Sequence, residues 1–176
     1  MLQDAGAQEA QYYLIALGSN MRHPAYGAPR FVVQASLDVL ARELGQLEAV
    51  SRLIETPPVG PSRRRYVNAV AVLCSSLAPP QMMAALAAIE ARFGRKRRGQ
   101  VWQARVLDLD IVLWSGGAFA QDDDETCLVL PHPAYRHRDF VLAPASRIAG
   151  DWRDPLTGLT IRHAFARLTK PHHAPR

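Results

Sequence analysis

Two aspartates separated by a single residue are the side chains in this sequence best suited to chemistry. Apolar and acidic residues alternate over 107–111, which is typical of a β-strand whose side chains point to opposite faces. Asp108 and Asp110 then share one face, roughly 6–7 Å apart, while Leu107, Leu109, Ile111 and Leu113 point to the other side, toward the core. Two neighbouring carboxylates repel each other unless a cation lies between them, and Mg²⁺ takes one or two carboxylates together with phosphate oxygens and water. A solvated strand face paired with surface lysine or arginine is the alternative.

The positive charge of the chain is concentrated beside this acidic pair. The 176 residues carry a formal net charge of +5, and six lysines and arginines lie between Arg92 and Arg105 with no acidic residue among them. A second basic cluster is 63–65. Charge confined to two short stretches favours a compact polyphosphate over a long nucleic-acid backbone, and guanidinium groups bind phosphate oxygens in pairs. A solvated charged loop is the alternative for these arginines.

Other candidate residues lie further from the acidic pair. His132 is flanked by prolines, and Tyr66 and Asn68 share a face of a predicted strand, where an amide can contact a heterocycle as donor and acceptor. The proline-rich segment 56–61 cannot form regular structure and offers backbone groups for a planar ligand. Each has a structural alternative: a turn histidine, a cross-strand amide pair and a plain connection, respectively. For Phe140 the alternative is a core position.

Several classes are disfavoured by the composition. Cys74 and Cys127 are far apart, which argues against a zinc site and for reduced thiols in a cytoplasmic protein. No apolar run approaches the ~20 residues of a membrane span, and the first residues lack the pattern of a signal peptide. The sequence contains neither a P-loop nor a Rossmann glycine motif.

The pattern of elements predicts how these residues are positioned. We expect strands at 12–17, 47–55, 66–76, 107–114 and 128–130, helices at 31–44, 79–93 and 139–148, and a short amphipathic segment at 161–168. In the second helix Glu90 interrupts an apolar stripe. The order β-α-β, β-α-β predicts an α+β fold, a ferredoxin-like split βαβ sandwich with a mainly antiparallel sheet covered by helices. We expect a flexible leader at 1–11, a single domain at 12–170 and a flexible tail at 171–176.

Six motifs, taken in order from about Tyr13 to Leu168, resemble the 6-hydroxymethyl-7,8-dihydropterin pyrophosphokinases of folate biosynthesis. They are ALGSN (16–20), ETPPVG (55–60), YVNAV (66–70), IEARFGR (89–95), RVLDLDI (105–111), and LPHP with RDFVLAP (130–133 and 138–144). Each motif is weak alone, but the six together are highly specific. The resemblance implies an ATP-dependent diphosphotransferase that transfers pyrophosphate to the pterin hydroxymethyl oxygen and releases AMP.

The resemblance also implies a role for particular residues. Asp108 and Asp110 hold two Mg²⁺ ions, and with Arg95 and Arg105 they form the catalytic group. ATP is bound by Glu90, Arg97, Arg98, Trp102, Ile111, His132 and Arg138. The pterin is bound by Thr56, Pro57, Val59, Gly60, Tyr66, Asn68 and Phe140. The implied partners are ATP and the hydroxymethyl dihydropterin, with no nucleic acid and no membrane, and the protein is expected to be a monomer.

The chain departs from the family pattern mainly in one loop. Family members usually have RWGPRT where this chain has VWQARV at 101–106. The chain therefore lacks an arginine and a Gly-Pro turn of the family pattern in this loop, whereas it keeps the acidic pair. The loop 122–125 has no role that we can assign.

Two rival functions remain open from the sequence. One is a ferredoxin-like nucleic-acid-binding module, which the sparse strand aromatics and the repulsive acidic pair disfavour. The other is a sugar-nucleotide transferase that uses an Asp-x-Asp metal site, which the absence of a nucleotide-binding α/β half disfavours.

Overall fold

The strands form one central sheet and one separate hairpin. The computed structural model describes residues 9–57, 64–94, 105–122 and 127–170. The sheet contains β1 (Gln11–Ser19), β2 (Gln46–Val50), β3 (Ile54–Thr56), β4 (Tyr66–Ser75) and β5 (Asp108–Trp114), in the order β2-β4-β1-β5 with β3 also paired to β4. All paired strands run antiparallel. The hairpin consists of β6 (Phe119–Asp122) and β7 (Cys127–Leu130).

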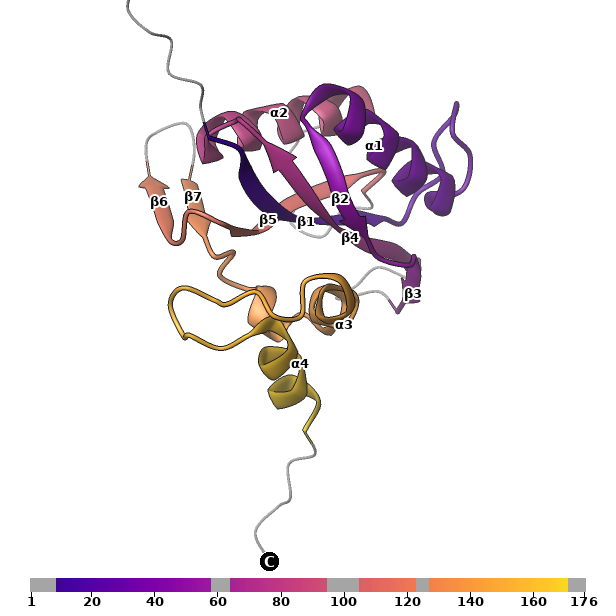
Figure 1. Cartoon of the computed structure of the whole chain (residues 1–176). Helices are drawn as coiled ribbons and strands as arrows, with labels where there is room; N and C mark the ends of the chain where they lie inside the picture. Colours follow the sequence, from indigo (N-terminus) through magenta and orange to yellow (C-terminus); the bar gives the residue numbers. More distant parts are fainter. Residues whose placement is uncertain (1–8, 58–63, 95–104, 123–126, 171–176) are drawn as a thin grey trace, which may run out of the picture.

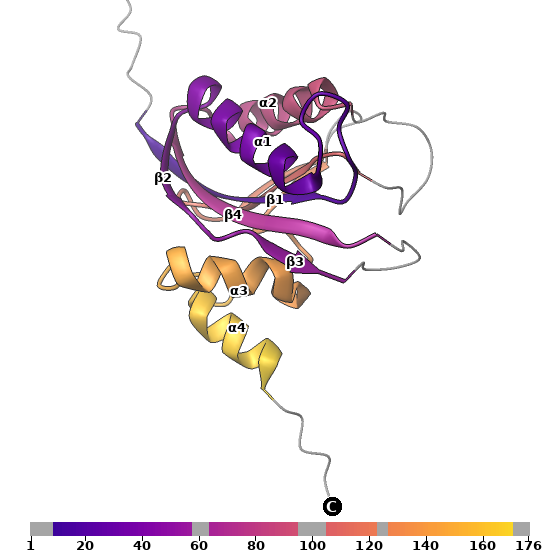
Figure 2. The same ribbon diagram turned by 90° about the vertical axis from the view of Figure 1, so that its right-hand side faces the viewer.

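Helices cover both faces of the sheet. On one face lie α1 (Pro29–Glu43) and α2 (Pro79–Arg92), and on the other lie α3 (Asp139–Ile148) and α4 (Ile161–Thr169), as Figures 1 and 2 show. Because α1 joins β1 to β2 and α2 joins β4 to β5, the chain makes the split βαβ crossover twice. This confirms the predicted ferredoxin-like α+β class. No helix in the described part of the chain is long and apolar enough to cross a membrane.

The central strand β1 is buried on both faces, which explains its almost continuous apolar sequence. Tyr13, Ile15 and Leu17 pack into the core beneath α1 and α2, whereas Leu14 packs into the core beneath α3 and α4. Alternating side chains of one strand therefore supply two separate cores. The functional residues must lie where one of these cores gives way to polar side chains.

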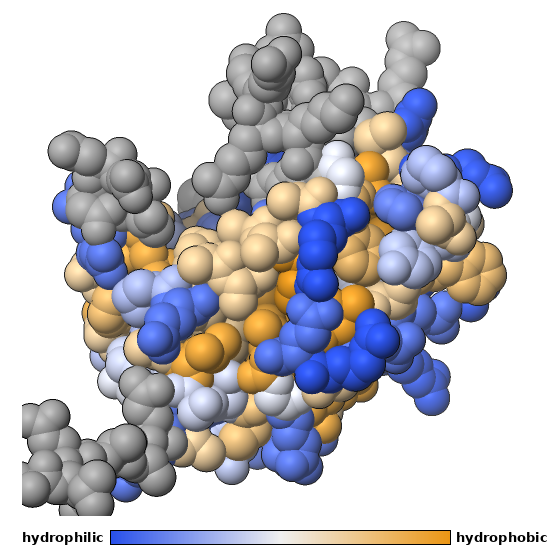
Figure 3. Space-filling view, turned by 90° about the horizontal axis from the view of Figure 1, so that it is seen from above, coloured by the Kyte–Doolittle hydropathy of each residue, from blue (hydrophilic) through white to orange (hydrophobic). Residues whose placement is uncertain are grey.

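An exposed ion pair joins the ends of α1 and α2 at the outer surface of the layer they form. Arg92 Nη2 at the end of α2 lies 2.6 Å from Glu43 Oε2 at the end of α1. Viewed from this side, hydrophilic residues break up the apolar surface (Figure 3). Such exposed pairs contribute little to stability, so the buried stripe of each helix is what fixes its position.

The predicted strand at 47–55 is wrong as a single element. It is interrupted at 51–53, where the Ser51 hydroxyl accepts a hydrogen bond from the Val70 N–H at 2.9 Å, and it continues as β3. The prediction also missed β6, which is short and carries polar residues. Gln11, assigned to the flexible leader, is the first residue of β1 and pairs with Ser75. The rest of the leader up to residue 8, and the tail 171–176, lie outside the described residues.

A bulge in β5 overturns one expected side-chain direction. Leu14 pairs with Leu113 and Ile15 pairs with Ile111, so Val112 has no partner of its own in β1. The extra residue reverses the alternation, and Leu113 packs beneath α3 and α4 instead of on the side of Ile111. The alternation holds before the bulge, where the two aspartates lie.

Candidate active site

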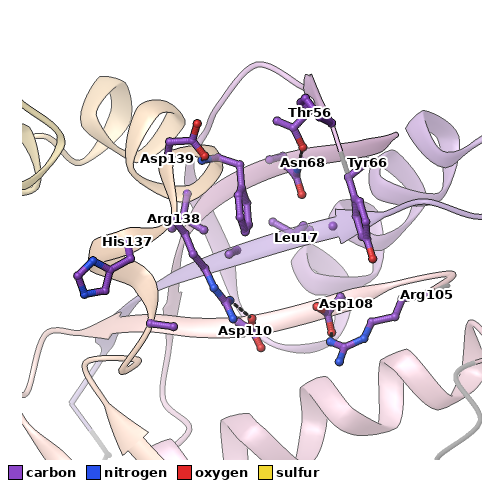
Figure 4. A pocket seen from close by; sticks show the side chains of 17 residues that line it. Leu17, Thr56, Tyr66, Asn68, Arg105, Asp108, Asp110, His137, Arg138 and Asp139 are labelled. Carbon is purple, nitrogen blue, oxygen red and sulfur yellow. Dashed lines mark hydrogen bonds and ion pairs between the residues drawn. The ribbon is translucent and has the colours of Figure 1, made fainter. Parts of the chain in front are cut away.

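A cleft of about 530 Å³ opens between the sheet and the N-terminal end of α3 (Figure 4). Its walls come from β1, β3, β4, β5, the short 3₁₀ helix η1 (Tyr135–His137) and the start of α3. Nine of the predicted site residues line it: Thr56, Pro57, Tyr66, Asn68, Arg105, Asp108, Asp110, Arg138 and Phe140. Because Gly18 and its neighbours in ALGSN line it as well, the cleft brings together residues from five of the six sequence motifs.

The floor of the cleft is made of small residues of β1. Gly18 pairs with Asn68 of β4 on one side and with Asp108 of β5 on the other, and Ala16 pairs with Asp110 in the same way. A Cβ atom at Gly18 would lie 3.1 Å from Asn68 Oδ1, which is tighter than ordinary van der Waals contact. The motif ALGSN thus leaves open space between an amide and a carboxylate.

The two aspartates share the face of β5 that forms the cleft wall, as the alternation predicted. Asp108 is paired with Arg105, and Asp110 Oδ2 accepts a hydrogen bond from Arg138 Nη1 at 3.0 Å. The aspartate side chains are 23% and 32% exposed, so both can reach a ligand in the cleft. Figure 4 shows the two acid–base pairs side by side along β5. Each carboxylate thus has a guanidinium neighbour that reduces the repulsion between them.

Arg105 is held in place from a distant part of the chain. Asn20, at the end of β1, accepts the Arg105 N–H with its Oδ1 at 2.8 Å and donates its own N–H to the Arg105 carbonyl at 3.1 Å. Burial lowers the pKa of Arg105, but the charge of Asp108 outweighs this effect and the pKa lies above its ordinary value. Arg105 therefore stays a cation at the edge of the cleft.

His132 approaches the aspartate pair from the segment between β7 and α3. Its Nε2 lies 3.8 Å from Asp110 Oδ2, while its Nδ1 accepts the Ala134 N–H at 3.0 Å. Burial lowers the pKa of His132, and the nearby Asp110 only partly offsets this. The ring is then neutral at pH 7 with its proton on Nε2, because Nδ1 acts as an acceptor.

The opposite end of the cleft carries an oriented amide and an aromatic ring. Asn68 Nδ2 donates a hydrogen bond to Thr56 Oγ1 at 2.8 Å, which leaves Asn68 Oδ1 as the acceptor that lies beside the floor. Tyr66 lines the side of the cleft that lies away from Arg138 (Figure 4). Burial raises the pKa of Tyr66, and the charge of Asp108 adds to the effect, so its hydroxyl remains protonated at pH 7. This end suits a planar ligand with a polar edge.

Besides His132, which lies next to Asp110 without lining the cleft, two predicted nucleotide-binding residues have their side chains outside it. Ile111 is 2% exposed and packs in the core beneath α1 and α2, on the face of β5 opposite to the aspartates. Glu90 is 4% exposed and its Oε1 accepts the Leu109 N–H at 2.8 Å. Glu90 therefore belongs to the buried stripe of α2 that it was expected to interrupt, and it joins α2 to β5 between the two aspartates.

Replacing Glu90 by alanine should lower the free energy of unfolding by about 2–3 kcal/mol, because the buried Leu109 N–H loses its acceptor. Glu90→Gln keeps an acceptor and should recover most of the loss. Urea unfolding measures the effect, with Glu43→Ala, which removes only an exposed ion pair, as the control. Equal effects of the Glu90 and Glu43 alanine variants would contradict this role of Glu90.

Some predicted site residues lie outside the described part of the chain, and some residues that form the site were not predicted from the sequence. Arg95, Arg97, Arg98, Trp102, Val59 and Gly60 lie outside the described residues. The sequence reasoning assigned no role to Gly18, Asn20, His137 or Asp139, of which all except Asn20 line the cleft. The motif ALGSN was noted, but only the fold reveals that its glycine forms the floor and its asparagine holds Arg105, 85 positions further along the chain.

The cleft gathers carboxylates suited to a metal ion and arginines suited to phosphate on a split βαβ sheet. This combination defines a class of enzymes that transfer a phosphate-containing group from a nucleotide. The sequence profile of one such family, 7,8-dihydro-6-hydroxymethylpterin-pyrophosphokinase (HPPK), matches residues 14–150. The chain therefore belongs to the HPPK family.

Relatives in two bacteria share substantial identity with the chain. The 2-amino-4-hydroxy-6-hydroxymethyldihydropteridine pyrophosphokinase of Pseudomonas aeruginosa is 41% identical over 147 residues, which cover 82% of this chain and 85% of the relative. The protein of the same name from Synechocystis sp. is 34% identical over 155 residues, covering 88% of this chain and 74% of the relative. These matches confirm the family indicated by the six motifs.

The fold is also similar to that of solved structures. The wild-type HPPK-DHPS of Plasmodium falciparum superposes with a TM-score of 0.74 at 12% identity, over 93% of this chain and 42% of the other. The same protein with pteroate gives a TM-score of 0.70 at 13% identity, over 90% of this chain and 42% of the other. The chain thus spans about two fifths of the length of these larger proteins.

Proposed function

We propose that this cleft transfers pyrophosphate from ATP to the hydroxymethyl oxygen of 6-hydroxymethyl-7,8-dihydropterin, yielding the pterin diphosphate and AMP in folate biosynthesis. The observation that carries the proposal is the row Asn68–Gly18–Asp108 across three adjacent strands. Two strand spacings, roughly 10 Å, separate the amide from the carboxylate. A bicyclic heterocycle with a one-carbon arm spans this gap over the glycine and brings its hydroxyl to the aspartates.

The carboxylate pair fits Mg²⁺ that arrives with a nucleotide. In the described ranges, no cluster of three or more histidine, cysteine or acidic side chains could form a metal cage by itself. Mg²⁺ needs no such cage, because it takes most of its oxygen ligands from phosphate and water. Asp108 and Asp110 would hold two ions in this proposal. Such ions would supply positive charge that neutralises the charge developing on the phosphates during transfer.

The cationic side chains around the pair would bind and orient the triphosphate. Arg105 and Arg138 lie on either side of the aspartates, within reach of phosphate oxygens in the cleft. His132 would donate its Nε2 proton to the nucleotide. The resemblance adds Arg95, Arg97, Arg98 and Trp102, and Glu90 would act through the strand it holds. Phosphate-group transfer depends on such positioning and charge neutralisation, with little covalent chemistry for the protein to perform.

The pterin would lie at the amide end of the cleft. Asn68 Oδ1 accepts from a ring N–H or amino group, and the Thr56 hydroxyl keeps the amide in that orientation. Tyr66 and Phe140 offer aromatic faces for the flat ring. Pro57 lines the same end, and Val59 and Gly60 follow it in the chain.

The direct test is an assay with ATP, Mg²⁺ and 6-hydroxymethyl-7,8-dihydropterin. We expect AMP and the pterin diphosphate to form in equal amounts, and no AMP without the pterin. Single-stranded RNA at low salt serves as the competing ligand. Tight, steeply salt-dependent RNA binding without pterin-dependent AMP formation would favour the nucleic-acid-binding function instead.

Filling the floor of the cleft should exclude the pterin. In Gly18→Val the new side chain meets the Asn68 amide and the Tyr66 ring, so we expect pterin affinity to fall roughly tenfold or more. Fluorescence titration measures the affinity and thermal unfolding checks the fold. Ala120→Val, at an exposed position of β6, is the control. Undiminished pterin binding by a folded Gly18→Val protein would place the ligand elsewhere.

A further inference from the structure

A buried carboxylate lies outside the cleft and beyond the residues that the family profile matches. Asp154, between α3 and α4, is 2% exposed. Its Oδ2 accepts hydrogen bonds from Tyr135 Oη at 2.7 Å and from Arg136 Nε, and its Oδ1 accepts the Leu156 N–H at 2.8 Å. A charge so thoroughly desolvated is expensive to bury, and its value often lies in fixing one conformation.

The donors keep this carboxylate ionised. Burial alone would raise the pKa of Asp154, but the hydrogen bonds from Arg136, Tyr135 and Leu156 outweigh burial and lower the pKa below its ordinary value. The carboxylate is therefore charged at any pH at which the enzyme would work. It acts as a fixed anchor, and no pH-dependent switch follows from it.

The segment that Asp154 contacts is η1, which lies directly between two proposed nucleotide-binding residues. A series of backbone hydrogen bonds connects β5 to Arg138 through this segment. The His132 N–H donates to the Val112 carbonyl, and the Tyr135 N–H donates to the His132 carbonyl. The Arg138 N–H then donates to the Tyr135 carbonyl at 3.1 Å. Tyr135 is thus the middle point of the connection from β5 to Arg138. Its ring is 1% exposed and packs against the core beneath α3 and α4.

We propose that Asp154 is a positioning residue for the transfer reaction, which anchors η1 through Tyr135 and Arg136 and thereby sets the Arg138 guanidinium against Asp110. The inference rests on the proposed role of Arg138 in binding the nucleotide. Packing of the Tyr135 ring against the core fixes how deeply η1 lies in the protein. The hydrogen bonds from Tyr135 and Arg136 to Asp154 Oδ2 keep η1 from rotating. A guanidinium at the end of a flexible side chain is only as well placed as the backbone that carries it.

A double-mutant cycle distinguishes positioning from a general contribution to stability. In Asp154→Asn one oxygen becomes an amide that cannot accept, so η1 loses part of its anchor. We expect the KM for ATP to rise about tenfold in the otherwise unchanged enzyme, more than any change in pterin affinity. In the Arg138→Ala background the same substitution should change the KM for ATP less than twofold, because the group it positions is already gone.

The controls separate failure of this inference from failure of the proposed function. Asp151→Asn alters an exposed carboxylate that forms an ion pair with Arg162 at the surface. This control variant should leave the kinetics unchanged. If Arg138→Ala alone leaves the KM for ATP unchanged, the proposed role of Arg138 is wrong. The positioning role is wrong if Arg138→Ala raises the KM for ATP but Asp154→Asn does not. It is also wrong if Asp154→Asn raises the KM for ATP equally in the unchanged enzyme and in the Arg138→Ala variant.

Asp154→Asn is expected to weaken the fold as well, because buried donors of Tyr135 and Arg136 lose their acceptor, so a milder variant is also needed. Tyr135→Phe removes one of the two donors from η1 and leaves the ring and the Arg136 contact in place. We expect about a threefold rise in the KM for ATP, again lost in the Arg138→Ala background. An unchanged KM for folded Tyr135→Phe together with additive effects of Asp154→Asn would overturn the inference.

Discussion

Replacing Asp110 by asparagine is expected to lower kcat by roughly 10³-fold or more while the fold is retained. The amide has the same shape but no charge, so it is a poor ligand for Mg²⁺ next to the reacting phosphates. A loss of that size corresponds to about 4 kcal/mol of transition-state stabilisation. Steady-state release of AMP measures the rate, and Mg²⁺ titration should give a higher half-saturating concentration.

Asp38→Asn provides the matched control for this experiment. Asp38 lies exposed on α1, on the opposite side of the sheet from the cleft, so its variant should retain full activity. Thermal unfolding of both variants checks that the fold is intact. AMP release by Asp110→Asn at the unmodified rate would remove Asp110 from the metal site and leave the cleft without its proposed chemistry.

The placement of the acidic pair was predictable because it depends on a local rule. Alternation along 107–111 requires no knowledge of neighbouring strands, and the structure has Leu109 in the core and Asp108 and Asp110 in the cleft. The same rule failed for Leu113, where a bulge adds one residue to β5. A bulge depends on how two strands pair, and a single strand's sequence does not contain that information.

The contacts that support the site were not predictable, because they join residues far apart in the chain. Asn20 holds Arg105, Glu90 holds Leu109, and Asp154 holds Tyr135. In the sequence, a buried acid looks the same as an acid on a solvated helix face, as the expectation for Glu90 illustrates. Only the packing of α2 on β5 turns that carboxylate into a hydrogen-bond acceptor for the strand between the two aspartates.

Removing the Arg105 side chain is the second change with a large expected effect. In Arg105→Ala the phosphates lose a cation and the Arg105–Asp108 ion pair is lost, so we expect kcat to fall about 10²-fold. Pterin affinity should change less than twofold, because Asn68 and Thr56 bind the ring independently of this side chain. Stopped assays for AMP and fluorescence titration of the pterin measure the two quantities separately.

Arg105→Lys shows whether the geometry of the guanidinium matters as well as its charge. Lysine keeps the cation but loses the planar pair of donors that fits a phosphate, so it should recover only part of the rate. Arg162→Ala, at an exposed position of α4, is the control. Full activity of Arg105→Ala would exclude Arg105 from the site. Full recovery by lysine would mean that Arg105 contributes only charge, and that bidentate contact with the phosphates plays no part.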